Sequence, residues 1–217
     1  MDDEPAGRLR RFVEQGGTLV MSAHSAIKDR DNAFTGATIP IAGLTNLFGV
    51  ERDSFQTYQP PSRQKNALRF DDGSSVPFRV FAEVLRPTTA RVIAKWDRDY
   101  LKDSPAATER QVGKGKAVYF GSLLNVDAAR YLIKRYAAEN KLKPLVADAP
   151  EQVEVRSRTK GKTNFYFLLN HGDSSATVNV GDGFSDALTD EPAAASLTLP
   201  PFGYRVLKRE RLAEQAH

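Results

Sequence analysis

The run PAGRLRRFVEQGGTLVM, residues 5–21, decides how the first part of the chain folds. Its apolar residues recur at helical spacing over residues 5–15, which predicts an amphipathic helix. Gly16 and Gly17 are typical of a helix end, and the apolar run 18–21 directly after them is typical of a buried strand. Helix, glycine stop and strand form half of an α/β repeat with a parallel sheet. The apolar face of the helix would consist of Leu9, Phe12 and Val13.

The stretch up to residue 140 predicts more strands, a short helix and one long helix. From Val126 to Asn140 the apolar residues recur at helical spacing, and Asn125 precedes them as a plausible N-cap. The run Asp71-Asp72-Gly73 is a strong turn signal between two strands. We expect a short helix at 42–48 and strands at 67–70, 76–85, 90–96 and 117–120.

The last third of the chain has no helical pattern. Residues 142–150 read as a linker, and short strands follow, separated by turn-forming residues. Strands at this spacing predict a small antiparallel β-sandwich of about sixty residues. The expected strands are 153–158, 164–170, 176–180, 196–199 and 204–208.

Composition excludes several classes of protein. The 217 residues are 41% hydrophobic and 27% charged, which is ordinary for a globular chain and argues against disorder. The net charge of +4 comes from basic clusters that lie far apart and alternate with acids, so we expect no nucleic-acid partner. No apolar run is long enough to span a membrane, and the acidic start is wrong for a signal peptide. With no cysteine, thiol chemistry is excluded, and a cytoplasmic location fits best.

Three local patterns suggest chemistry but lack essential parts. The run GKGK at 113–116 lacks the spacing and hydroxyl of a phosphate loop, so a tight hairpin turn is favoured. Ser22, His24, Ser25 and Asp29 follow a strand, but the glycines of a nucleophile elbow are missing. The acids near Asp29 resemble the start of a calcium loop without its glycine or closing glutamate. We therefore expect no cofactor, no metal and no catalytic residue.

Glycoside hydrolysis needs two carboxylic acids on a rigid frame. Glu83 and Glu109 are available, but the sequence shows no evident partner for either. The usual frame, a β/α barrel, needs about 200 residues or more of strand–helix alternation. This chain contains at most two such units, so we expect it to be inactive alone.

Several segments, taken in order, resemble the end of the family 42 glycoside hydrolases, β-galactosidases that assemble as trimers. RLRRFVEQGGTLV (8–20) resembles a helix and strand of their trimerisation domain, and IKDRDN (27–32) the loop after it. FLLNH (167–171) and LPPFG (199–203) resemble their small C-terminal sandwich. Other matching segments are IAGLTNLFGV (41–50), ARVIAKW (90–96), PAAT (105–108) and GKGKAVYFG (113–121).

The resemblance implies an incomplete flavodoxin-like domain, similar to class I glutamine amidotransferases, at 1–147, followed by the antiparallel sandwich at 150–210. The family's catalytic glutamates lie in a barrel to which no segment here corresponds, and the missing cysteine excludes amidotransferase activity. The trimerisation domain would begin before Leu9, which leaves the strand at 18–21 short of neighbours. An unpaired apolar strand edge seeks a partner, so we expect self-association or aggregation.

These observations predict a non-catalytic assembly region of a β-galactosidase. It would self-associate, as a trimer in the family, or bind a separate catalytic barrel chain, and would meet galactoside only in the full enzyme. We expect the polar loop after the strand to contact a partner or a neighbouring active site; its candidate residues are His24, Lys28, Asp29, Asn32 and Phe34.

Two other functions stay open. The sandwich could be a free-standing carbohydrate-binding or adaptor module, with Tyr166, Phe184 and Tyr204 as the available rings. Two of these rings exposed on one face would favour it. An independent hydrolase would need a pocket joining Ser22 or Ser25 to His24 and Asp29.

Overall fold

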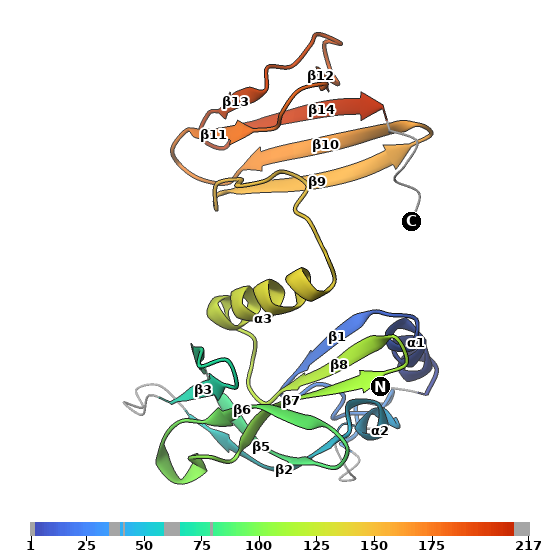
Figure 1. Cartoon of the computed structure of the whole chain (residues 1–217), viewed down its shortest axis with the longest axis vertical. Coiled ribbons are helices and arrows are strands. Elements are labelled where there is room, and N and C mark those ends of the chain that lie inside the picture. Colours follow the sequence, from blue (N-terminus) through green and yellow to red (C-terminus); the bar gives the residue numbers. More distant parts are fainter. Residues whose placement is uncertain (1–2, 35–39, 41, 59–65, 79, 211–217) are drawn as a thin grey trace. The chain divides into compact units, whose positions relative to one another are not determined.

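The computed structural model describes residues 3–34, 40, 42–58, 66–78 and 80–210. The chain divides into two compact units, residues 1–140 and 141–217 (Figure 1). Among the described residues, no helix is long and apolar enough to cross a bilayer.

The described residues of unit 1 form mostly strands, with two longer helices and one short one. Its helices are α1 (Asp3–Glu14), α2 (Leu44–Phe48) and α3 (Val126–Glu139), and Asp99–Leu101 forms one 3₁₀ turn. Its strands are β1 (Thr18–Ser22), β2 (Val50–Thr57), β3 (Ala67–Phe70), β4 (Ser75–Pro77), β5 (Phe81–Pro87), β6 (Arg91–Trp96), β7 (Pro105–Val112) and β8 (Gly115–Phe120).

The main sheet of unit 1 is mixed. Its strand order is β1-β8-β7-β6-β3-β4, and among the strands that the structure describes only β1 and β8 are parallel. Strand β1 lies at one edge of the described sheet. Strands β2 and β5 form a separate antiparallel pair. The predicted parallel arrangement is therefore confirmed at β1 and β8, while the other pairings are antiparallel.

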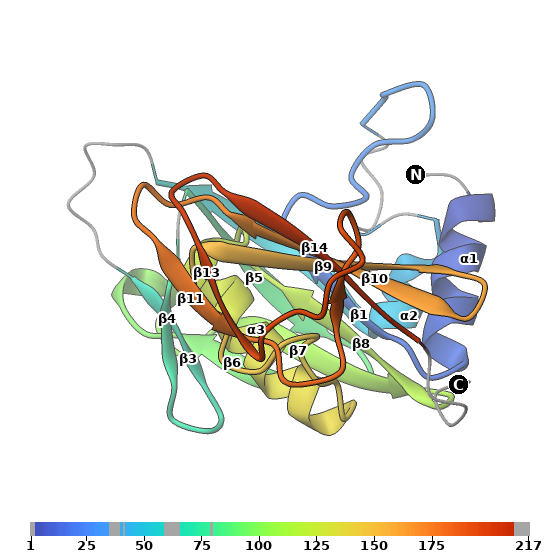
Figure 2. The same ribbon diagram turned by 90° about the horizontal axis from the view of Figure 1, so that it is seen from above.

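Helices cover both faces of the parallel pair. Leu19, Met21, Ala117 and Tyr119 pack in one apolar cluster with α1 and α2, and α1 lies along β1 and β8 (Figures 1 and 2). The alternate residues, such as Val118, pack in a second cluster with α3. Because side chains alternate across a strand, one short parallel pair supports two cores. Unit 1 is thus of mixed α/β class, as expected, with mostly strands and few helices.

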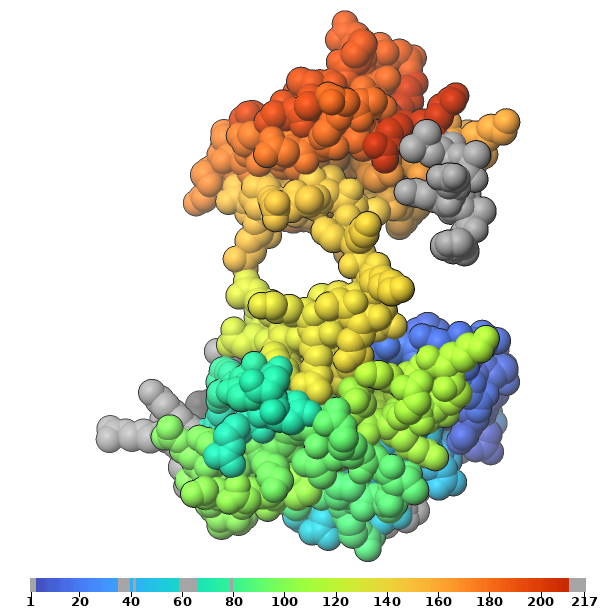
Figure 3. Space-filling model, viewed as in Figure 1, coloured from blue at the N-terminus to red at the C-terminus, as the bar shows by residue number. Residues whose placement is uncertain are grey.

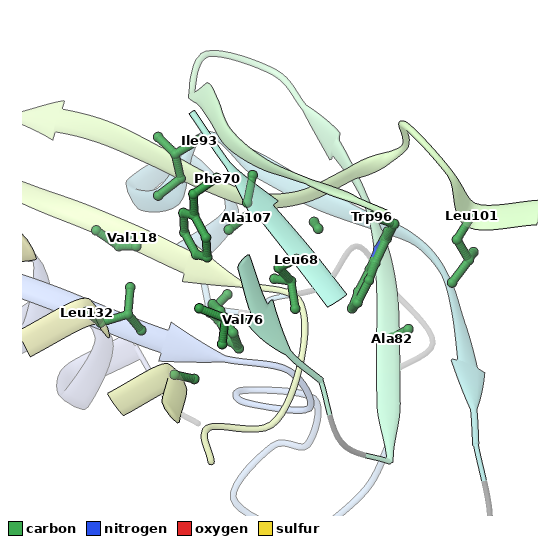
Figure 4. Packing of buried hydrophobic residues seen from close by; sticks show 14 of the residues in the cluster. Leu68, Phe70, Val76, Ala82, Ile93, Trp96, Leu101, Ala107, Val118 and Leu132 are labelled. Atoms are coloured by element: carbon green, nitrogen blue, oxygen red, sulfur yellow. The ribbon is translucent and has the colours of Figure 1, made fainter. Parts of the chain in front are cut away.

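The larger core packs against the six-stranded sheet. Trp96 is fully buried and lies among Leu68, Val76 and Ala82, side chains that come from four different strands (Figure 4). Helix α3 closes the cluster through Leu132.

Several predicted elements need correction. The run 76–85 is two strands, because the chain turns at Val80, whose φ is +66°. Strands β2 and β7 were not predicted, since both are rich in exposed or half-buried polar residues. In α1, Phe12 is half exposed, and Ala6 takes its place beside Val13 on the buried face.

Helix α3 matches its prediction. The Asn125 side chain accepts a hydrogen bond from the backbone N–H of Ala128 at 2.8 Å, which caps the helix. The outer face of α3 lies at the surface of unit 1, where Val126 and Ile133 are about two-thirds exposed (Figure 3).

Unit 2 is an antiparallel sandwich. Strands β9, β10 and β14 run side by side in a four-stranded sheet of order β12-β14-β10-β9, and β11 and β13 form the second sheet (Figures 1 and 2). Leu168, Leu199 and Leu207 are buried in its own apolar cluster. Its strands are β9 (Val153–Lys160), β10 (Thr163–Asn170), β11 (Ala176–Asn179), β12 (Ser185–Asp186), β13 (Ser196–Leu199) and β14 (Tyr204–Glu210).

Candidate functional site

The carboxyl ends of the two parallel strands meet at one place in unit 1. After β1, the backbone N–H of Ala23 donates to the carbonyl of Ser122, which follows β8, at 3.1 Å. Strand β5 joins them, since the backbone N–H of Glu83 donates to the carbonyl of Gly121 at 2.7 Å. In open α/β sheets this is the edge where ligands and partners usually bind. Polar side chains gather here.

Glu83 is fully buried at this edge. Its Oε1 accepts a hydrogen bond from the backbone N–H of His24 at 3.1 Å and lies 3.5 Å from the Arg52 guanidinium. Its Oε2 accepts from the Tyr119 hydroxyl at 2.8 Å. The sequence showed no evident partner for Glu83, and the structure gives its carboxylate three contacts, none of them with a second carboxylic acid. Its partners lie 31 to 59 positions away in the sequence, where local patterns give no signal.

The Tyr119 hydroxyl is held as a donor. Burial, and then the charge of the adjacent Glu83 carboxylate, raise the pKa of the Tyr119 phenol far above its ordinary value. The phenol therefore keeps its proton and donates to Glu83. This pairing satisfies one oxygen of a carboxylate that would otherwise be costly to bury.

His24 begins the predicted loop in a left-handed conformation, with φ +61°. Its imidazole lies against the Phe81 ring, with 4.0 Å between centroids, and meets the edge of Phe55 at 5.3 Å. The Arg52 guanidinium stacks over the Phe55 ring at 5.1 Å. The His24 ring is thus packed between the loop and the β2–β5 pair.

The rest of the predicted loop is organised by Asp29. Its Oδ1 accepts hydrogen bonds from the backbone N–H groups of Asp31 and Ala33 at 3.0 and 2.9 Å. Lys28 and Phe34 face each other in a β-bridge around this turn. Asn32 adopts φ +61°, a conformation that asparagine tolerates better than most residues. The five candidate residues therefore belong to one continuous loop.

The contacts of Asp29 and His24 do not fit the hydrolase arrangement that the sequence analysis considered. The Asp29 carboxylate serves the backbone of its own loop, while the His24 imidazole lies against Phe81 and 4.0 Å from the Glu83 carboxylate. In the described part of the chain, no three His, Asp or Glu side chains form a group suited to a metal ion. The run GKGK forms the tight β7–β8 hairpin that its sequence favoured.

Two aromatic rings are exposed, one at the end of the loop and one packed against His24. Phe34, at the end of the loop, is 56% exposed, and Phe55, which packs on the His24 ring, is 50% exposed. Exposed aromatic side chains on an ordered framework are typical of protein–protein contact surfaces. Phe34 was a candidate from the sequence, whereas Phe55 lies in a strand that the sequence did not reveal.

Comparison with known proteins identifies both units. Residues 1–143 match the model of the β-galactosidase trimerisation domain, and residues 152–209 match that of the β-galactosidase C-terminal domain. This chain belongs to glycoside hydrolase family 42.

Individual family 42 relatives agree along nearly the whole chain. It is 27% identical to β-galactosidase Pbg of Clostridium perfringens and 28% identical to β-galactosidase LacZ of Heyndrickxia coagulans, each over 94% of this chain. The β-galactosidase of Bacillus circulans sp. alkalophilus superimposes with a TM-score of 0.86, at 28% identity over 96% of this chain. For Gan42B, a family 42 β-galactosidase of G. stearothermophilus, the TM-score is 0.84 at 27% identity over 97% of this chain.

The chain spans about 30% of the length of these curated relatives and 30 to 31% of these two structures.

In the family 42 sandwich, the two segments that carried the resemblance meet. The backbone N–H of Asn170 donates to the carbonyl of Gly203 at 2.9 Å. The Asn170 side chain donates to the carbonyls of Ser174 and Pro200, both at 2.8 Å, and accepts from the Gln152 side chain at 3.0 Å. Asn170 is 3% exposed, so it acts as a buried polar clamp at this end of the sandwich.

The aromatic rings proposed as a sugar platform do not form one. Tyr166 and Phe184 are buried and pack edge to face, with 5.2 Å between centroids. Tyr204 is exposed, as is Phe202, which the sequence reading did not single out. The condition of two exposed candidate rings on one face is therefore not met.

Glu109, the second glutamate considered for catalysis, is also engaged by the fold. Its carboxylate accepts from the Tyr136 hydroxyl at 2.8 Å and from Arg91 at 3.0 Å, with Lys116 at 3.7 Å. These contacts hold the pKa of the Glu109 carboxyl below its ordinary value despite burial, which opposes them. A group of this kind ties α3 to the sheet.

Proposed function

We propose that this chain acts as the assembly region of a family 42 β-galactosidase and performs no hydrolysis by itself. The observation that carries the proposal is the match of residues 1–143 to the trimerisation domain. The buried contacts of Glu83 and Glu109 support it, since both carboxylates are used to hold the fold.

The proposed partners are further copies of this chain, as a trimer, or a catalytic barrel carried on another chain. Galactoside would be bound only in the full enzyme. We propose no nucleic-acid or membrane partner. The cytoplasmic location also stays a proposal from the sequence.

We place the contact surface at the loop of His24, Lys28, Asp29, Asn32 and Phe34. Support comes from the exposed Phe34 ring and from Phe55 on the adjacent strand β2. Phe55 packs against the ring of His24, the first residue of this loop. Burial of two such rings in an interface would contribute several kcal/mol, at about 25 cal/mol per Å² of apolar surface.

We also propose that unit 1 has a flavodoxin-like fold, similar to that of class I glutamine amidotransferases. The proposed domain limits are 1–147 for this unit and 150–210 for the sandwich. The proposed fold is supported by the parallel β1–β8 pair with helices on both faces. A pair of this kind is the repeating unit of such folds.

Sedimentation equilibrium tests the assembly proposal. The chain of 24.0 kDa is expected to associate towards a mass three times that value as concentration rises. A Phe34→Ser, Phe55→Ser double variant is expected to weaken association by about ten-fold or more, because it removes apolar contact area. Phe202→Ser in the sandwich is the control, since it replaces an even more exposed ring outside the proposed surface.

A monomer that is stable to dilution would contradict the assembly proposal. Hydrolysis of a chromogenic galactoside by the purified chain would contradict the non-catalytic part, and we expect none above background.

A further inference from the structure

We propose that Glu83 is the positioning residue of the loop from His24 to Phe34, and that its carboxylate sets the geometry of the contact surface. The inference rests on the proposed function for the role of that surface. It starts from Glu83 being fully buried directly beneath the first residue of the loop.

The loop needs an acceptor at this point. His24 leaves strand β1 with a positive φ, so the course of the chain changes sharply here. Its backbone N–H is part-buried and donates to the Glu83 carboxylate. A buried N–H without a partner is costly, so the conformation depends on this one acceptor.

The acceptor itself is fixed by the core. The Tyr119 hydroxyl occupies the other carboxylate oxygen at 2.8 Å. The main chain of Glu83 is held on both sides, since its carbonyl accepts from the Trp96 indole N–H at 3.0 Å and its N–H donates to Gly121. Glu83 therefore links the first residue of the loop to side chains and backbone of the core. Functional groups need such support from rigid elements to keep their geometry.

The Glu83 carboxylate also contacts Arg52, which stacks on Phe55, the ring that β2 contributes to the proposed surface. Arg52 lies 3.5 Å from Glu83 Oε1 and is only 10% exposed at its side chain. Its guanidinium stacks over Phe55 at 5.1 Å. One buried group therefore contacts both the first residue of the loop and the arginine that stacks on Phe55.

Amide hydrogen exchange of the full chain, resolved by peptide, tests this. The main variant is Glu83→Leu combined with Arg52→Leu. It removes the acceptor without leaving a buried charge unpaired, a replacement that folds often tolerate. Exchange in residues 23–34 is expected to rise about ten-fold, the effect of losing one buried hydrogen bond. A β9–β10 peptide in unit 2 is expected to keep its rate.

Conservative variants separate positioning from general stability. Glu83→Gln keeps an acceptor at the same reach, so it is expected to keep slow exchange in 23–34. Glu83→Asp keeps the charge but withdraws it by one methylene, so faster exchange is expected. This Asp and Gln pair decides the matter if the double variant does not fold.

Unchanged exchange of 23–34 in the folded double variant, or equal exchange in the Asp and Gln variants, would overturn the proposal. A rise spread evenly over unit 1 would overturn it too, because it would show loss of global stability alone. Sedimentation of the same variants separates the two proposals. Faster loop exchange with unchanged association supports the role of Glu83 and contradicts the assembly role of the loop.

Discussion

Asp71 shows how single side chains bind α3 to the sheet. Its carboxylate, in the turn between β3 and β4, accepts from Arg135 at 2.8 Å and from Arg91 at 2.5 Å. The Arg135 hydrogen bond lowers the pKa of the Asp71 carboxyl to about 2, against burial, and Arg91 adds to the effect. A carboxyl whose pKa is depressed in the folded state contributes its full stabilisation at pH values above its ordinary pKa of 3.8. That stability is lost as the pH falls through about 2.

Asp71→Asn is therefore expected to lower the free energy of unfolding at pH 7 by about 1 kcal/mol. The effect on the free energy of unfolding is small because the Asp71 side chain is a third exposed, so solvent screens its ion pairs. The difference from the wild type should shrink between about pH 4 and pH 2, as the native carboxyl takes up its proton. Urea unfolding at several pH values measures it. Asp182→Asn, in a turn of unit 2, is the matched control; an equal loss there would contradict the assignment.

The sequence predicts contacts between near neighbours along the chain, but not contacts between residues far apart in it. The Asn125 cap and the Asp71-Asp72-Gly73 turn were predictable, because both depend on neighbours within three or four positions. The partners of Glu83 were not, since they reach across the sequence and are brought together only by the topology. The sequence indicated the loop but gave no sign of what holds it.

Gly115 joins two elements at the start of β8. A Cβ at this position would lie 2.2 Å from the carbonyl oxygens of both Val13 and Gly17, which belong to the end of α1 and the entry to β1. Gly115→Ala is expected to lower the free energy of unfolding by about 1–3 kcal/mol, because backbone would have to move. Thermal unfolding measures the change.

Gly7→Ala is the control for Gly115→Ala. Gly7 lies inside α1, and an added Cβ would meet only the far end of the Arg11 side chain, at 3.6 Å. Alanine favours a helix by about 1 kcal/mol over glycine, so this variant is expected to be slightly stabilised. Equal behaviour of the two alanine variants would contradict the proposed close packing of α1 against β8.

At the level of elements, the apolar pattern of the sequence predicted the helices and strands that bury one regular face. Helices α1 and α3 and the sandwich strands carry clear periodicity. Strands β2 and β7 do not, because each places polar residues on its exposed positions and their β-pairing arises from partners far along the chain. The parallel repeat read from residues 5–21 was right for β1 and β8. It gave no indication that the chain would then return in antiparallel strands.

For the whole molecule, the family and the two-part organisation followed from the order of short motifs. No single motif is diagnostic, and their meaning came from spacing along nearly the full chain. The match of one family model to each part agrees with this interpretation. The proposed contact surface also includes Phe55, whose packing against His24 only the three-dimensional arrangement of β2 and the loop reveals.

Each compact unit has its own apolar core, so we expect two transitions in calorimetry. Leu168, fully buried in unit 2, and Leu132, 4% exposed in unit 1, provide a matched pair. Replacing either by alanine leaves a cavity and costs about 2–5 kcal/mol. Each variant is expected to lower the midpoint of one transition by about 10 °C or more, and the two variants should affect different transitions. A single transition lowered equally by both would contradict the division of the chain into two cooperative units.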